Sequence, residues 1–113
     1  TYYTEKKYGL YADQGEGDQW VYVLSNPSLP KEYLKIGYTK LKPEERAIQI
    51  SSATGVPTPY KVEWAYKCFN GEIVERMTHE KLKAFRVNNR KEFFHISLEE
   101  AKDSIILIGN KFK

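Results

Sequence analysis

The sequence of 113 residues contains a single cysteine, Cys68. One thiol cannot form a disulfide within the chain, and no second cysteine is present to make a zinc-binding pair. Cys68 follows the apolar and aromatic residues Trp64, Ala65 and Tyr66, so we expect a buried strand residue. A nucleophilic role would need a basic partner nearby. The shortage of cysteine favours an intracellular protein, located in the cytoplasm, the nucleoid or the nucleus.

Long apolar runs are also missing from the sequence. No stretch approaches the roughly 20 apolar residues that a membrane span requires, so we expect no membrane association. The first residues are polar and aromatic, which is not the pattern of a signal peptide. Because the sequence begins with Thr1 rather than methionine, we expect a longer protein with a further domain or a partner subunit.

Neither sign of charge dominates the composition. There are 18 Lys and Arg residues against 15 Asp and Glu, which gives a net charge of +3. This balance permits nucleic-acid binding without demanding it. The nine tyrosines suit base stacking, and they suit half-buried strands, which is the commoner use. Length and composition therefore indicate one globular domain.

The order of turn residues and apolar positions predicts the architecture. Residues 1–19 read as an N-terminal arm or linker and residues 20–113 as the domain. Within the domain the patterns predict four strands, at 20–24, 33–38, 62–69 and 92–96, and three helices, at 43–52, 70–85 and 97–108. Residues 87–91 are expected to form a polar loop. The predicted fold class is α+β, a small, mainly antiparallel sheet flanked by three helices in the order β-β-α-β-α-β-α.

Single residues refine this prediction. Asn70 is expected to cap the second helix, and Ser97 with Glu100 to form a capping box at the third. Gly109 is expected to end the third helix. Gly37, inside a strand, indicates a bend or the close approach of another backbone.

An ordered series of short motifs follows these elements. Its members are Val21-Tyr22-Val23, Lys35-Ile36-Gly37-Tyr38-Thr39, Pro43-Glu44-Glu45-Arg46, Ser51-Ser52-Ala53-Thr54-Gly55-Val56-Pro57, Glu75 with His79, and Glu92-Phe93-Phe94. The series resembles the GIY-YIG nuclease superfamily, in the branch found in phage proteins and in a fungal meiotically up-regulated family. The resemblance covers most of the chain, from Trp20 to about Ile105.

The resemblance implies roles for five residues. Tyr22 matches the tyrosine that contacts or deprotonates the attacking water, and Lys35 stands where the second tripeptide usually has tyrosine. Arg46 matches the arginine that holds the scissile phosphate. Glu75 matches the single carboxylate that binds the metal. Glu92 falls loosely where many members have a late asparagine.

The chemistry of these side chains suits phosphodiester cleavage. The guanidinium of Arg46 presents a fixed fork to phosphate oxygens. Glu75 offers a hard oxygen ligand to Mg²⁺ or Mn²⁺, which needs few protein ligands. Lys35 lies across a hairpin from Tyr22, so we expect its charge to lower the tyrosine pKa from its usual value of about 10. We expect Arg46 and Glu75 to meet over the hairpin and share one phosphate and one cation.

His79 lies four residues after Glu75, so both project from one helix face. It can be a second metal ligand, a base or a phosphate contact, and a plain helix histidine hydrogen-bonded to Glu75 is an equal alternative. Many members of the superfamily place a histidine or tyrosine one turn after the arginine, where this sequence has Ile50. His79 is a candidate for that missing group.

Each candidate also has an ordinary structural explanation. Tyr22 alone would be a routine strand tyrosine, Arg46 a solvated helix residue and Glu75 part of a charged helix face. Their coincidence on two strands and two helices raises the site above background. The expected catalytic set is therefore Tyr22, Lys35, Arg46, Glu75 and His79, and the expected nucleic-acid contacts are Tyr38, Lys40, Lys42, Arg86 and Arg90.

Three functions remain open at this point. The first is an endonuclease that cuts nucleic acid, with DNA favoured, using Mg²⁺ or Mn²⁺. The second is a noncatalytic nucleic-acid-binding module, which Lys35 and Ile50 favour and the joint presence of Arg46 and Glu75 disfavours. The third is a protein-interaction domain that uses the tyrosine-rich arm.

Overall fold

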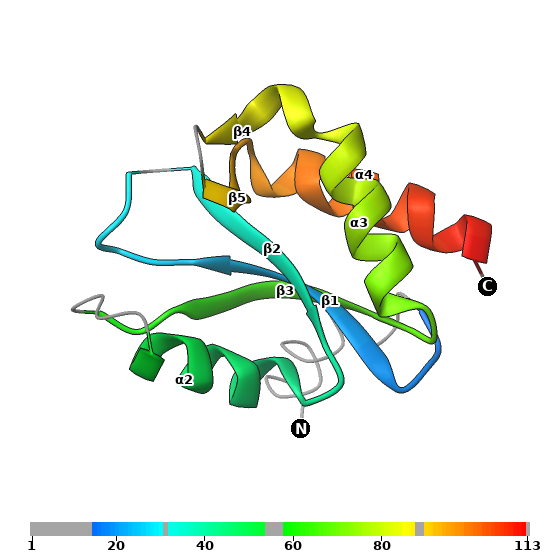
Figure 1. The fold of residues 1–113 in the computed structure, drawn as a ribbon, viewed down its shortest axis with the longest axis horizontal. Helices are drawn as coiled ribbons and strands as arrows, with labels where there is room; N and C mark the ends of the chain where they lie inside the picture. Colours follow the sequence, from blue (N-terminus) through cyan, green and yellow to red (C-terminus); the bar gives the residue numbers. More distant parts are fainter. Residues whose placement is uncertain (1–14, 31, 54–57, 88–89, 113) are drawn as a thin grey trace.

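The computed structural model describes residues 15–30, 32–53, 58–87 and 90–112, which form an α+β fold (Figure 1). Its antiparallel sheet has five strands in the order β3-β1-β2-β5-β4. The strands are β1 (Gln19–Ser25), β2 (Tyr33–Thr39), β3 (Lys61–Cys68), β4 (Arg86–Val87) and β5 (Arg90–His95). The helices are α2 (Pro43–Ala53), α3 (Gly71–Lys81) and α4 (Leu98–Gly109), with 3-10 turns η1 (Lys83–Phe85) and η2 (Asn110–Phe112). Most of the expected arm, residues 1–14, lies outside the described residues.

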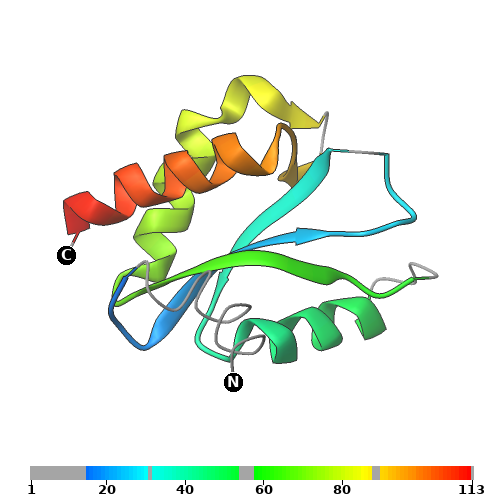
Figure 2. The same cartoon turned by 180° about the vertical axis from the view of Figure 1, so that it is seen from behind.

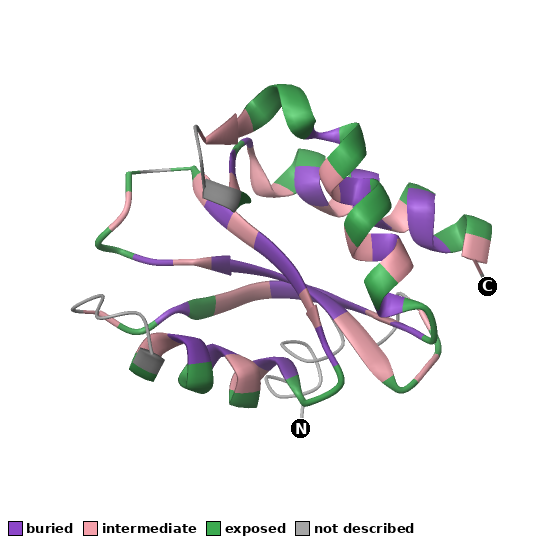
Figure 3. Cartoon of the chain, in the orientation of Figure 1, coloured by how far each residue is buried: buried purple, intermediate pink, exposed green. Residues whose placement is uncertain are grey.

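The two faces of the sheet carry different helices. α2 packs on one face, and α3 and α4 together cover the other (Figures 1 and 2). Side chains alternate between these faces, so Tyr22 points to the α2 face while its neighbours Val21 and Val23 point to the α3 and α4 face. Buried residues run along the middle of the strands and along the helix faces that meet them (Figure 3). None of the described helices is both long and apolar enough to cross a membrane.

Only the first part of β2 pairs with β5, and helix α3 packs against the rest of that edge. β5 pairs with β2 at three positions, Tyr33, Leu34 and Lys35. Beyond Lys35 the strand continues to Thr39, and α3 packs along it. His79 of α3 makes a hydrogen bond to the carbonyl oxygen of Ile36, immediately past the last pair with β5. Side chains from α3 can therefore reach the edge of β2.

The predicted fold class is confirmed, and two local predictions are wrong. Residues 87–91 do not form a simple loop, because Val87 pairs with Arg90 in a short antiparallel hairpin. The second helix ends at Lys81, and a separate 3-10 turn follows. The third helix ends at Gly109, as predicted, and a 3-10 turn continues the chain.

The helix caps differ in how well the sequence predicted them. Ser97 Oγ accepts a hydrogen bond from the Glu100 amide at 3.1 Å, as the capping-box pattern predicts. Asn70 makes no side-chain cap for α3, and its amide nitrogen instead donates to the Phe112 carbonyl at 3.2 Å. Gln19 Oε1 takes its place by accepting from the Gly71 amide at 3.0 Å. This partner comes from β1, so local sequence did not reveal it.

Candidate active site

Tyr22 lies across the strand opposite Gly37. The two residues are antiparallel partners, and Tyr22 is only 2% exposed. A Cβ atom on Gly37 would lie 2.4 Å from Tyr22 Oη and 2.6 Å from Cζ. Gly37 is therefore required by the close approach of a side chain, rather than by the bend or backbone contact expected from the sequence.

Substituting Gly37 by alanine is expected to lower the free energy of unfolding by about 2–3 kcal/mol, because the new methyl group overlaps a buried ring. Urea denaturation of the variant measures this loss. In a Tyr22→Ala background the ring is absent, so the same substitution should cost much less. Equal costs in the two backgrounds would show that the Tyr22 ring is not what Gly37 accommodates.

Arg46 and Tyr22 form the first contact of the site. Burial raises the pKa of Tyr22 above its ordinary value of 10.0, a hydrogen bond donated by Arg46 lowers it, and the charge of Glu92 raises it again. The net pKa is raised, and the cation that lowers it is Arg46 rather than the expected Lys35. Because the phenol is buried, Tyr22 in this conformation positions Arg46 rather than an exposed water molecule. Arg46 is further held by Gln49, whose side-chain oxygen accepts from Nη1 at 3.1 Å.

Lys35 is engaged by Glu92. The two side chains form an ion pair, in which that of Lys35 is 11% exposed and that of Glu92 is 48% exposed. The Lys35 ammonium also lies 5.2 Å from the centre of the Phe93 ring. This pairing explains why Lys35 does not act on Tyr22, because a carboxylate already offsets its charge. Glu92, which the sequence matched only loosely, is thus a full member of the site.

Glu75 is the carboxylate that α3 supplies. Burial raises its pKa from the ordinary value of 4.5 to about 7, with a further rise from the charge of Glu92 and an opposing effect from Lys35. These influences place Glu75 near the Lys35–Glu92 pair. A nearby cation would stabilise the ionised form of this carboxyl group and would take the place of its proton.

The raised pKa of Glu75 also makes stability depend on pH. The folded state binds the proton more tightly than the unfolded state, so this contribution is complete below pH 4.5 and disappears as the pH rises to about 7. The variant Glu75→Gln cannot ionise, so it does not lose this stability as the pH rises. At pH 8 its free energy of unfolding should exceed that of the wild type by about 1 kcal/mol, after allowing for solvent screening. Urea denaturation at pH 5 and pH 8 measures it, with the exposed Glu99→Gln as control. A gain at pH 5 equal to that at pH 8 would contradict the prediction.

His79 contacts the backbone of β2. Its Nε2 lies 2.7 Å from the Ile36 carbonyl oxygen, and its ring centre lies 5.0 Å from that of Phe94. Since a carbonyl only accepts hydrogen bonds, Nε2 carries the proton and Nδ1 is left with a lone pair. Burial lowers the pKa of His79 below its ordinary value of 6.5, so the ring is neutral at pH 7. The hydrogen bond to Glu75 considered from the sequence is replaced by this one.

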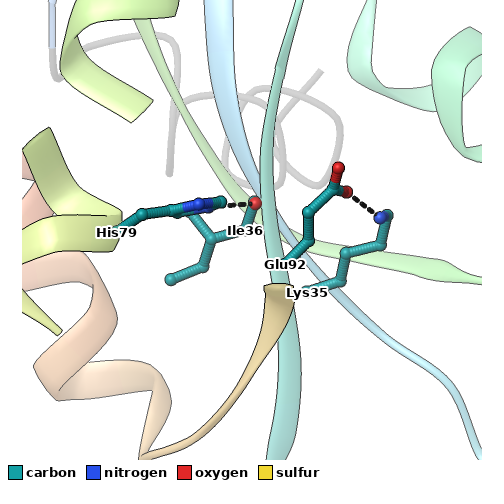
Figure 4. Close-up of polar contacts among 4 residues, drawn as sticks. All are labelled: Lys35, Ile36, His79 and Glu92. Carbon is teal, nitrogen blue, oxygen red and sulfur yellow. Dashed lines mark hydrogen bonds and ion pairs between the residues drawn. The ribbon is translucent and has the colours of Figure 1, made fainter. Parts of the chain in front are cut away.

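The site is divided by the edge of β2. Tyr22, Arg46 and Lys35 lie on the α2 face, whereas Glu75 and His79 come from α3 on the other side. Figure 4 shows His79 reaching β2 from one side while the Lys35–Glu92 pair lies on the other. Arg46 and Glu75 therefore approach the hairpin from opposite faces, and Tyr22 is the residue whose pKa both of them influence. This differs from the expected direct meeting above the hairpin.

A pocket of about 300 Å³ opens beside α3, and its lining includes Glu75, His79, Tyr38, Arg76 and Arg86. Two of the expected nucleic-acid contacts, Tyr38 and Arg86, are thus next to the candidate metal ligand. Lys40 lines a neighbouring pocket. Lys42 is exposed at the start of α2. The side chain of Arg90 lies outside the described part of the chain.

The donor groups fit a hard divalent cation. Magnesium commonly binds through one or two carboxylates and keeps several water molecules. Glu75 supplies one carboxylate, and Glu92 is the nearby second one. Within the described ranges no three His, Cys, Asp or Glu side chains gather as a metal site. This donor set suits Mg²⁺ or Mn²⁺ better than a metal that needs a closed protein cage.

Two other sequence candidates are structural. Cys68 is buried and its pKa is raised to about 11 by burial, as a strand residue without a basic partner would be. Ile50 is 7% exposed and belongs to the core. The position one turn after Arg46 therefore contributes packing, and no polar group from it enters the site.

The fold and this site define a small α+β domain whose polar site residues gather where α3 meets the edge of β2. Residues 19–109 match the T5orf172 domain family, and the chain belongs to that family. The family falls in a nuclease-associated class of domains found in phage proteins. Membership indicates a nuclease-like or nucleic-acid-associated role. No curated protein and no solved structure matches the chain.

Proposed function

We propose that this domain is a divalent-metal-dependent endonuclease of the GIY-YIG type that hydrolyses phosphodiester bonds in intracellular DNA. One observation carries the proposal. Glu75 and His79 line one pocket together with Arg76 and Arg86. The pKa of the neighbouring Tyr22 is influenced by Arg46, Glu92 and Glu75 together. A cation for the phosphate and a carboxylate for the metal are thus brought near one tyrosine, which is the combination that phosphodiester hydrolysis requires.

The chain's own residues divide the work of hydrolysis. The guanidinium of Arg46 binds two oxygens of the scissile phosphate, and the hydrogen bond to Gln49 keeps it oriented. His79, neutral and with a lone pair on Nδ1, accepts the proton of the attacking water. Glu75 would hold Mg²⁺ or Mn²⁺, and the bound cation would offset the charge on the leaving oxygen and provide a bound water as its proton donor.

The experiment is a nicking assay on supercoiled plasmid and on single-stranded DNA. Each substrate is incubated with the chain in Mg²⁺, in Mn²⁺ and in EDTA, beside the variant Glu75→Ala. Cleavage that needs the metal and disappears in the variant supports the proposal. Cleavage that persists in EDTA would overturn the metal requirement, and no cleavage of either substrate with either metal would overturn the enzyme assignment.

A noncatalytic nucleic-acid-binding module is the second candidate. The burial of Tyr22 and of Ile50 favours it, because neither residue offers an exposed polar group to an attacking water. In that case Arg46 and the neighbouring lysines would bind the backbone without cutting it. Salt-sensitive binding of DNA with no nicking under either metal would establish this function in place of the first.

A further inference from the structure

A second pocket lies next to the candidate active site. It measures about 220 Å³, and its lining includes Phe69, Tyr38, Lys40, Gln19, Asn70 and Glu72. Phe69 is the most exposed of the large aromatic side chains in the described ranges, at 62%. An aromatic ring held in water costs free energy unless something covers it. The proposed function does not use this residue.

The chemistry of the lining selects the kind of ligand. Phe69 and Tyr38 offer aromatic rings for stacking, and Gln19 and Asn70 bring side-chain amides. Gln19 Oε1 accepts from the Gly71 amide and Asn70 Nδ2 donates to the Phe112 carbonyl, so the amide atoms that face a base are Gln19 Nε2 and Asn70 Oδ1. Rings and amides are what proteins use to hold unpaired nucleobases. Glu72 repels a phosphate, and the Gly71 amide at the start of α3 already donates to Gln19 at 3.0 Å. The pocket interior therefore fits a base, while Lys40 remains for the attached phosphate.

The position of the pocket links it to cleavage. It shares Tyr38 and Glu72 with the pocket that contains Glu75 and His79. Glu72 and Glu75 are one helical turn apart, about 4.5 Å along the axis. This short separation places a bound base within a nucleotide or so of a phosphate at Glu75.

We propose that this pocket binds an unpaired nucleobase beside the scissile phosphate, stacked on Phe69, so that the substrate is a single strand or a strand with an extruded base. The inference rests on the proposed function. In an intact duplex both faces of a base are stacked and its pairing edge is occupied, so neither the ring nor the amides can reach it. The pocket thus selects nucleic acid by the absence of pairing rather than by sequence.

The test measures binding without cleavage. Fluorescence anisotropy in EDTA follows a labelled single-stranded oligonucleotide, and a matched set carries one abasic position moved along the strand. The wild-type chain should bind at least one abasic strand about 10-fold more weakly than the intact strand. The variant Phe69→Leu keeps an apolar side chain without a stacking face and should show the same loss on the intact strand. Phe69→Trp should retain tight binding.

Two comparisons make the result decisive. Leu107→Ala removes another exposed apolar side chain, 52% exposed on α4, and should bind as the wild type does. On the most affected abasic strand, Phe69→Leu should lose no further affinity, because its partner base is already gone. Equal binding of all abasic and intact strands by the wild type overturns the proposal without reference to any variant.

The outcomes separate this inference from the proposed function. A chain that nicks plasmid but ignores every abasic position keeps the nuclease function and loses the base pocket. A chain that senses the base through Phe69 but cleaves nothing keeps the pocket and loses the nuclease function. Failure to bind any oligonucleotide overturns the base pocket, and the nicking assay then decides the proposed function by itself.

Discussion

Substituting Glu75 by glutamine is expected to reduce metal-dependent cleavage about 1000-fold, because the neutral amide has no negative charge with which to bind Mg²⁺. That factor corresponds to about 4 kcal/mol of transition-state stabilisation. The same variant is expected to be more stable than the wild type at pH 8, since it lacks a half-buried carboxylate whose pKa is raised to about 7. Loss of activity together with a gain in stability distinguishes a functional carboxylate from a structural one.

The measurement is single-turnover cleavage with saturating Mn²⁺, paired with calorimetric titration of Mn²⁺ into each protein. Glu75→Gln should bind the metal too weakly to detect, and wild-type binding should release protons near pH 7. Glu99→Gln changes an exposed carboxylate at the start of α4 and should leave cleavage and metal affinity unchanged. Normal cleavage by Glu75→Gln would remove Glu75 from the mechanism.

Substituting Arg46 by alanine is expected to reduce cleavage by about 100-fold to 1000-fold, the usual cost of removing one preorganised donor to a developing charge. Arg46→Lys should recover only a small part of the rate, because an ammonium cannot reproduce the planar fork that Gln49 and Tyr22 hold in place. The loss should appear in kcat more than in KM, since the guanidinium meets most of its charge in the transition state.

The matched control for Arg46 is Lys61→Ala, which removes a 73% exposed positive charge from β3. This charge lies outside the site, so the variant should cleave at close to the wild-type rate. If Arg46→Ala and Lys61→Ala weaken substrate binding equally, and with the same salt dependence, both residues act only as general contacts to the nucleic-acid backbone. That result would favour the noncatalytic module.

Local signals were sufficient for much of the fold. Apolar residues predicted β1, β2 and β3 to within one residue at most ends, because the middle of each strand is buried in the core and is therefore mostly apolar. Pro43 and the acidic first turn predicted where α2 begins. The β4–β5 hairpin escaped detection because its first strand has only two residues, which is too short to show a period.

The candidate site was predictable in membership and not in arrangement. Its residues stood out as charged or phenolic groups on otherwise apolar elements, and Gly37 signalled that something approaches β2. Nothing local indicated that Tyr22 is that neighbour, or that its pKa is raised rather than lowered. The Lys35–Glu92 pair joins residues 57 positions apart, so no spacing rule relates them.

The amino-acid sequence by itself determined the α+β class, the order of most elements and the residue types available for chemistry, since these follow from side-chain periodicity and composition. Only the tertiary structure decided which of those residues meet. Burial, the short pairing of β5 with β2, and the placement of α2 and α3 on opposite faces brought Arg46, Glu92 and Glu75 around Tyr22. Protonation depends on such neighbours and on access to water, and both exist only once the chain has folded.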